Sequence, residues 1–228
     1  MLLVLFDIDG TLVLTGRAGA RGMNLAFGRL HGNDHALEAV PIAGRTDRAI
    51  VIDAMRRIGV EPDDETIRAL HDAYIEILGV EIHRPAPGHP SRILPGVTAL
   101  LDTLDRRPGV TTGLLTGNFE RGAAVKLSHF DLWRRFRFGA FGDDHVDRRA
   151  LVPTAIERGR AAGADVPARA VVIIGDTPND IDCAKAHGAR ALGVATGPYS
   201  EADLREAGAD LTLPTLEPVE RVMSWMLG

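Results

Sequence analysis

The segment from Leu3 to Leu12, LVLFDIDGTL, constrains the fold of this chain more than any other feature. Its apolar start is too short for a helix, is rich in strand-forming residues and runs directly into two carboxylates, Asp7 and Asp9. A Gly-Thr turn follows, so we expect both carboxylates at the carboxyl end of a buried strand, where open α/β sheets bind ligands. Two carboxylates held this close repel each other unless a divalent cation or a shared proton lies between them.

Two later segments repeat this design, each with an apolar run that ends in small polar residues. The residues that follow these two runs are Thr116, Gly117, Asn118, Asp176 and Asp180. A lone Asp-x-Asp-Gly is often an ordinary turn with solvated side chains. Three strand ends that supply Asp/Asp, Thr and Asp/Asp are not explained by turn chemistry alone. The pattern therefore predicts one site built at the edge of a sheet.

Taken in order, DxDGT, Thr-Gly-Asn after a strand, and GDxxxD resemble motifs I, II and IV of the haloacid dehalogenase superfamily of hydrolases. The resemblance spans nearly the whole chain, from Asp7 to the last expected strand near Leu211. It implies an α/β fold with a doubly wound parallel sheet, a Rossmann-like core. The insert between motifs I and II resembles the helical cap of the subfamily that includes phosphoglycolate phosphatase and β-phosphoglucomutase.

The order of expected elements divides the chain into two domains. Residues 15–89 carry no convincing strand but three helical patterns, the second and third opening at the N-cap residues Thr46 and Asp63. We therefore expect an all-helical cap at 15–89, closed by a Pro-rich linker, and a core formed by 1–14 and 90–228. Helices are expected near 97–107, 119–130, 150–162, 178–187 and 217–227. Strands between them, one of them near 137–141, predict a parallel sheet with right-handed crossovers.

Composition excludes several classes of function. The net charge of −5 gives no support for a nucleic-acid surface, and no apolar run approaches the length of a membrane span. Cys183 is the only cysteine, so no disulfide forms within the chain. We expect a cytoplasmic protein that acts on a small-molecule phosphate ester, without nucleic-acid or membrane partners. The sequence does not decide between a monomer and a homodimer.

The resemblance implies a role for each acidic residue of the motifs. Asp7 is the expected nucleophile, which forms an aspartyl-phosphate. Asp9 is expected to protonate the leaving oxygen and then to take a proton from the attacking water. Mg²⁺ is expected on the Asp7 carboxylate, the Asp9 backbone carbonyl and Asp176, with Asp180 orienting a metal-bound water.

The resemblance also implies donors for the phosphoryl group. The Thr116 hydroxyl and the backbone amides of Gly117 and Asn118 are expected to face the transferring phosphoryl oxygens. The cap loop Gly44-Arg45-Thr46-Asp47 is expected to reach over the site. Arg45 there either contacts a second anionic group of the substrate or is a surface arginine beside an ordinary N-cap.

The lysine that the family places at motif III is missing from its usual position. The only lysines are Lys126 and Lys185, and Lys126 follows Thr116 too soon, within an expected helix, so we interpret it as a helix-surface residue. Arg148 and Arg149 precede the next helix, and an arginine can serve as a fixed cation toward both phosphate and Asp7. We favour Arg148 for this catalytic and phosphate-binding role.

Among the reactions of the superfamily, the residues favour phosphate monoester hydrolysis. Asp9 argues against dehalogenation, because a departing halide needs no proton. The expected cap contains no lysine, which excludes Schiff-base chemistry of the phosphonoacetaldehyde hydrolase type. We predict a Mg²⁺-dependent phosphatase of a phosphoglycolate-like or sugar phosphate. The alternatives are a β-phosphoglucomutase-like mutase and a catalytically idle binding or regulatory protein on the same scaffold.

Overall fold

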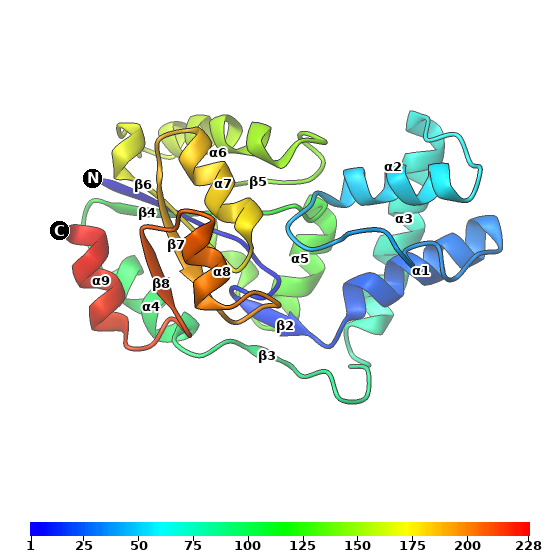
Figure 1. Ribbon diagram of the computed structural model, residues 1–228, viewed down its shortest axis with the longest axis horizontal. Coiled ribbons are helices and arrows are strands. Elements are labelled where there is room, and N and C mark those ends of the chain that lie inside the picture. The colour runs from blue at the N-terminus through cyan, green and yellow to red at the C-terminus, as the bar shows by residue number, and fades with distance from the viewer.

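The computed structural model describes all of residues 1–228, and its central element is a six-stranded parallel sheet (Figure 1). The strands lie in the order β5-β4-β1-β6-β7-β8, and every neighbouring pair is parallel. They are β1 (Leu2–Phe6), β4 (Val110–Leu115), β5 (Gly139–Ala140), β6 (Val171–Gly175), β7 (Arg190–Val194) and β8 (Leu211–Leu213). The predicted doubly wound α/β fold is confirmed.

The sheet is buried on both faces, which explains the continuous apolar runs of its strands. In β1, Leu2, Val4 and Phe6 belong to one apolar cluster, whereas Leu3 and Leu5 belong to another. The first cluster also contains residues of α4 (Val97–Asp105), α5 (Glu120–His129) and α9 (Val219–Leu227). The second contains residues of α6 (Leu151–Ala161), α7 (Pro178–Ala186) and α8 (Glu201–Glu206). Of these helices only the short α8 was not predicted.

Three further helices form a group of their own beside the sheet (Figure 1). They are α1 (Ala18–His31), α2 (Asp47–Arg57) and α3 (Asp64–Glu81), and they share a separate apolar cluster of 18 buried residues. The predicted N-caps are present: the Thr46 side chain accepts a hydrogen bond from the Ala49 amide at 3.2 Å. The Asp63 side chain accepts one from the Thr66 amide at 2.8 Å.

A two-stranded antiparallel ribbon lies where the chain passes between the sheet and this helical group. It consists of β2 (Val13–Thr15) and β3 (Ser91–Ile93), with Thr15 paired to Ser91. Neither strand was predicted, because three-residue strands whose partner is far away in the chain leave no local pattern. The division of the chain at residues 15 and 89 stays a prediction.

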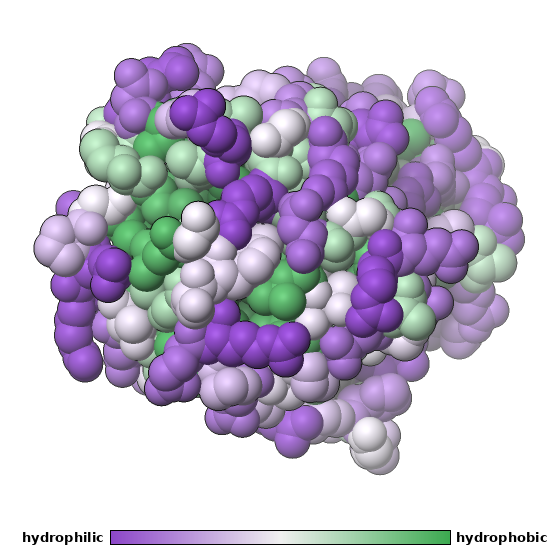
Figure 2. Space-filling model, turned by 60° about the vertical axis from the view of Figure 1, so that its left-hand side comes forward, coloured by the Kyte–Doolittle hydropathy of each residue, from purple (hydrophilic) through white to green (hydrophobic).

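Three further features are the edge strand, the apolar character of the helices and the surface. The strand expected near 137–141 is reduced to the two residues of β5, at the edge of the sheet. No α-helix of the protein combines the length and the apolar character that crossing a bilayer requires. On the face shown in Figure 2, apolar side chains gather in one area at the left and a smaller area near the centre, with polar side chains around both.

Candidate active site

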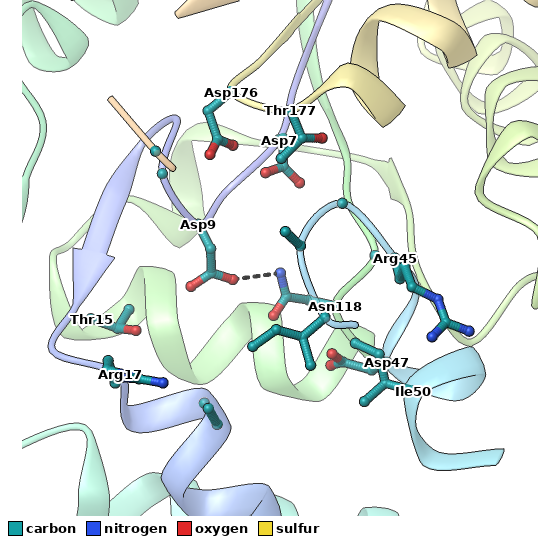
Figure 3. A pocket seen from close by; sticks show the side chains of 18 of the residues that line it. Asp7, Asp9, Thr15, Arg17, Arg45, Asp47, Ile50, Asn118, Asp176 and Thr177 are labelled. Carbon is teal, nitrogen blue, oxygen red and sulfur yellow. Dashed lines mark hydrogen bonds between the residues drawn. The ribbon is translucent and has the colours of Figure 1, made fainter. Parts of the chain in front are cut away.

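Three strand ends bring their acidic and hydroxyl residues to one edge of the sheet. Asp7 follows β1, and its amide donates a hydrogen bond to the Ile174 carbonyl of β6 at 3.0 Å. This register places Asp7 beside Asp176, the first residue after β6 (Figure 3). The carboxylates of Asp7, Asp176 and Asp180 offer oxygen atoms that all lie within 4.8 Å of one another. We call these three residues the carboxylate cluster.

Arg148 is the cation of the carboxylate cluster. One of its terminal nitrogens, Nη2, lies 2.9 Å from Asp7 Oδ1 and also donates to Asp180, and its side chain is 8% exposed. It belongs to a 3₁₀ turn, Arg148–Ala150, that Asp147 caps by accepting from the Arg149 amide. Arg149 points outward, where its exposed side chain pairs with Asp182. Of the two arginines, the structure brings only Arg148 to Asp7.

The three buried carboxylates of the cluster have only one cation, Arg148, beside them. Burial raises the pKa of Asp7 from 3.8 to about 7; Arg148 opposes this rise, and the charges of Asp180 and Asp9 add to it. Burial also raises the pKa of Asp176 well above its usual range, with further contributions from Asp7 and Asp180. One guanidinium does not neutralise three carboxylates, so the net negative charge of the ionised cluster favours binding of a divalent cation.

The free oxygen atoms of the cluster suit a hard cation such as Mg²⁺. Both oxygens of Asp180 already have protein partners: Arg148 binds Oδ1, and Thr177 donates to Oδ2 from its amide at 3.0 Å and its hydroxyl at 2.7 Å. Asp7 and Asp176 each have one carboxylate oxygen that accepts no side-chain hydrogen bond. The space beside Asp176 depends on Gly10, which has φ +80°; a Cβ there would lie 2.4 Å from Asp176 Oδ2. The residues present therefore fit the expected metal.

The second aspartate of motif I, Asp9, lies apart from the carboxylate cluster, in contact with a buried lysine. Lys126 Nζ lies 2.6 Å from Asp9 Oδ2 and 2.5 Å from Asn118 Oδ1. Asn118 Nδ2 in turn donates to Asp9 Oδ2 at 2.9 Å (Figure 3). We call Asp9, Lys126 and Asn118 the Asp9 network. Burial opposes the charge of Lys126, but Asp9, Tyr74 and Asp47 outweigh it and raise the pKa of the ammonium.

The interpretation of Lys126 as a helix-surface residue is wrong. Its side chain is only 6% exposed, because α5 turns this position toward the site rather than toward solvent. The sequence held a signal for this. Lys126 stands beside Leu127 and one turn after Ala123, two residues of the buried face of α5, so it interrupts an apolar stripe.

The motif II residues take different places around the site. Thr116 is fully buried, and its hydroxyl oxygen accepts from the Asn118 amide at 3.3 Å and from Asn118 Nδ2 at 2.8 Å. Gly117 and Asn118 line the cavity described below, whereas Thr116 does not. Their contact with a phosphoryl group stays a prediction.

A cavity of about 530 Å³ lies between this edge of the sheet and the three helices. The charged residues that the sheet side contributes are Asp7, Asp9, Lys126, Arg148 and Asp176. The helical side contributes both polar and apolar residues. Among them are Arg17, Met23, Arg45, Asp47, Ile50 and Tyr74. A small molecule in this cavity would touch both parts of the protein.

The loop before α2 is docked on the motif II loop. The Asp47 amide donates to the Gly117 carbonyl at 2.7 Å, and the Asp47 carboxylate accepts from the Phe119 amide at 2.9 Å. The Thr46 hydroxyl donates to the Val146 carbonyl at 2.7 Å. Burial raises the pKa of Asp47 to about 6, although Lys126 and the Phe119 amide favour its ionised form. The structure thus shows the helical group closed over the site.

Two arginines of the helical part differ in where they point. The Arg45 guanidinium lies 2.6 Å from Asp53 Oδ2 and donates to the Pro41 carbonyl at 3.1 Å, so it extends away from Asp9 (Figure 3). Its contact with a substrate stays a prediction. Arg17 lines the same cavity, forms no ion pair and has φ +62°. No motif pointed to Arg17, because its position depends on the ribbon that the sequence did not reveal.

Comparisons with known proteins agree with this geometry. A family model for haloacid dehalogenase-like hydrolases matches residues 1–188. The phosphoglycolate phosphatase of Mesorhizobium japonicum is 28% identical over 210 residues, which cover 90% of this chain and 86% of that protein. Phosphoglycolate phosphatase 1 of Pseudomonas aeruginosa is 28% identical over 226 residues, covering 94% and 76%. The crystal structure of CbbY from Rhodobacter sphaeroides in complex with phosphate shares the fold, with a TM-score of 0.72, 20% identity and 96% coverage of both chains.

Proposed function

This chain belongs to the haloacid dehalogenase-like hydrolases, and we propose that it is a Mg²⁺-dependent phosphatase of a small phosphate monoester. The observation that carries the proposal is the Asp7 carboxylate, which Arg148 holds at the wall of the cavity, two residues before Asp9. The relatives named phosphoglycolate phosphatases support phosphoglycolate as the substrate, and a sugar phosphate is the other ester that we propose to test.

The proposed reaction proceeds in two displacements. A carboxylate oxygen of Asp7 attacks phosphorus and forms an aspartyl-phosphate, while the bond from phosphorus to the alkoxide oxygen breaks and that oxygen takes a proton from Asp9. Water then attacks the same phosphorus, Asp9 takes back a proton, and the bond to Asp7 breaks to release inorganic phosphate. Each step needs positive charge nearby, because an anionic group approaches an anionic centre.

The residues present supply part of that charge and the sites for the rest. Arg148 lines the cavity beside Asp7, so its guanidinium would stabilise the charge of the phosphoryl group. Asp7, Asp176 and the Asp9 carbonyl would hold Mg²⁺, and Asp180 would orient a water molecule bound to it. When bound, Mg²⁺ would keep Asp7 ionised despite its raised pKa and neutralise phosphoryl oxygens.

The donors of motif II complete the proposed site. The amides of Gly117 and Asn118 would bind the phosphoryl oxygens, and the Thr116 hydroxyl, which accepts from Asn118, would donate its own proton to them. Closure of the helical part would exclude water from the cavity while the ester is bound.

Phosphate release from a panel of esters tests this proposal. The panel contains phosphoglycolate, sugar phosphates, nucleotides and p-nitrophenyl phosphate, each assayed with Mg²⁺, with EDTA and with the Asp7→Asn variant. Release that requires both Mg²⁺ and Asp7 would support the phosphatase, and the ranking of esters would identify the substrate class. Interconversion of sugar phosphates without release would instead favour the mutase. No turnover and no Mg²⁺ binding would favour an idle scaffold.

A further inference from the structure

We propose that Lys126 is a positioning residue that holds the Asp9 carboxylate where it exchanges a proton with the leaving oxygen. The inference rests on the proposed phosphatase function and adds a residue to it. Lys126 lies in neither the DxD, the Thr-Gly-Asn nor the GDxxxD motif, and it does not reach the carboxylate cluster through any hydrogen bond.

The hydrogen bonds of the Asp9 network distinguish the two oxygens of Asp9. Oδ2 accepts from Lys126 Nζ at 2.6 Å and from Asn118 Nδ2 at 2.9 Å. Oδ1 accepts no hydrogen bond from the protein, and Asp9 lines the cavity. A carboxyl group anchored by one oxygen presents the other in a fixed direction. Oδ1 is therefore the atom that would carry the proton to the leaving oxygen and receive one from water.

Because Lys126 is buried, its ion pair with Asp9 restrains the Asp9 side chain. The Lys126 side chain is 6% exposed, whereas that of Asp9 is 42% exposed. A buried ammonium is costly unless it is paired and hydrogen-bonded, so its partners hold it in place, and it holds them. Asp9 would otherwise be free to change rotamer in a cavity open to water. The buried partner thus fixes the exposed one.

The helical part covers the ammonium from the other side. A Cβ added to Gly19 of α1 would lie 3.1 Å from Lys126 Nζ and 3.6 Å from the Tyr74 hydroxyl of α3. The glycine allows α1 to approach the ammonium closely, and Tyr74 is itself buried. Because α1 and α3 belong to the part that closes over the site, closure would exclude water from Lys126. The position of Asp9 is then coupled to the closed arrangement.

A purely structural ion pair would predict different kinetics from a positioning role. Proton donation by Asp9 matters when the leaving group is an alkoxide, which needs a proton, and matters little for p-nitrophenolate, which does not. In the first displacement, a variant that misplaces Asp9 therefore slows alkyl esters selectively, whereas a variant that loosens the whole site slows both esters.

The test compares Lys126→Met with Lys185→Met, the matched control at the only other lysine, which pairs with Asp210 on the surface. First-turnover rates are measured by quenched flow with p-nitrophenyl phosphate and with the best alkyl phosphate of the panel. For Lys126→Met we expect a loss of about 30- to 100-fold with the alkyl ester and under about threefold with the aryl ester. Lys185→Met should match the wild type with both.

A double-mutant comparison with Asp9→Asn completes the test. If Lys126 acts through Asp9, the double variant Asp9→Asn/Lys126→Met loses no more than Asp9→Asn alone, within about threefold, because the two residues act as one unit. Should Lys126→Met unfold, Lys126→Gln, which keeps a donor without the charge, is measured with the same expected selectivity.

Two results would overturn the positioning role while leaving the phosphatase intact. One is an equal loss with both esters in a folded variant, and the other is a double variant whose losses multiply. Failure of the wild-type protein to release phosphate from any ester would be a different result, because it overturns the proposed function itself.

Discussion

The carboxylate cluster and the Asp9 network lie at one site but are built in different ways. The cluster and Arg148 belong to the sheet side, where all four side chains are nearly inaccessible to solvent. In the Asp9 network, a half-exposed aspartate depends on a lysine of α5 that two helices of the other part cover. The hydrogen bonds of both arrangements join residues of the sheet side, but in the second the Lys126 ammonium is also covered by α1 and α3 of the helical part. We therefore expect substitutions in the carboxylate cluster to impair the attack on phosphorus, and substitutions in the Asp9 network to impair proton transfer to the leaving group.

The largest expected effect is on the carboxylate cluster itself. Asp7→Asn removes the proposed nucleophile, so kcat should fall by at least about 10⁴-fold with every ester, aryl and alkyl alike. Phosphate release under saturating Mg²⁺ measures it. Substantial turnover of p-nitrophenyl phosphate by the folded variant would show that Asp7 is not the nucleophile.

The second largest effect is expected for Arg148, the cation of the carboxylate cluster, and the neighbouring Arg149 serves as a control. Arg148→Met should lower kcat/KM by about 10²- to 10³-fold, because it removes charge that stabilises the phosphoryl transition state. Arg149→Met, which removes only the exposed pair with Asp182, should stay within about twofold of the wild type. Equal losses in the two variants would contradict the assignment of Arg148.

Metal removal should change stability in a pH-dependent way. The folded pKa of Asp7, about 7, lies above its ordinary value of 3.8, so between these pH values the folded chain holds more protons than the unfolded chain. The free energy of unfolding of the metal-free protein therefore falls as pH rises from about 4 to about 7. Mg²⁺ should raise the Tm by about 5 °C or more at pH 8, but by less at pH 5.

Thermal melts in EDTA and in Mg²⁺ at the two pH values measure this difference. Asp7→Asn should reduce both the pH dependence and the effect of Mg²⁺, whereas Lys126→Met should leave the effect of Mg²⁺ unchanged. A Mg²⁺ effect of equal size at pH 5 and pH 8 would place the metal elsewhere.

The smallest effect is expected for Arg45, which lines the cavity but pairs with Asp53. Arg45→Met should change KM for each ester by less than about threefold, since its guanidinium already has a carboxylate partner in the closed protein. Steady-state kinetics with phosphoglycolate and with p-nitrophenyl phosphate measure it. A rise in KM of tenfold or more, confined to the ester that carries a second anionic group, would show that Arg45 leaves Asp53 to contact substrate.

Sequence reasoning succeeded where a residue's position follows from its own strand. Asp7, Thr116 and Asp176 each come directly after an apolar run, and the carboxyl ends of neighbouring parallel strands meet at one edge. It failed for Lys126, because the apolar stripe that it interrupts is short and weak, and a charged side chain was assigned to the helix surface. The ribbon formed by β2 and β3 was also missed, since its two strands lie on either side of the whole helical insert.

The sequence by itself determined the doubly wound sheet, the helical insert and the acidic residues at the sheet edge, because strand periodicity and turn residues are local properties. Only the tertiary structure decided that Arg148 rather than Arg149 reaches Asp7, that Arg45 pairs with Asp53, and that Lys126 reaches Asp9. These contacts join residues from different elements, and α1 and α3 also cover Lys126. Their formation depends on how helices and loops pack, which no single segment of the chain encodes.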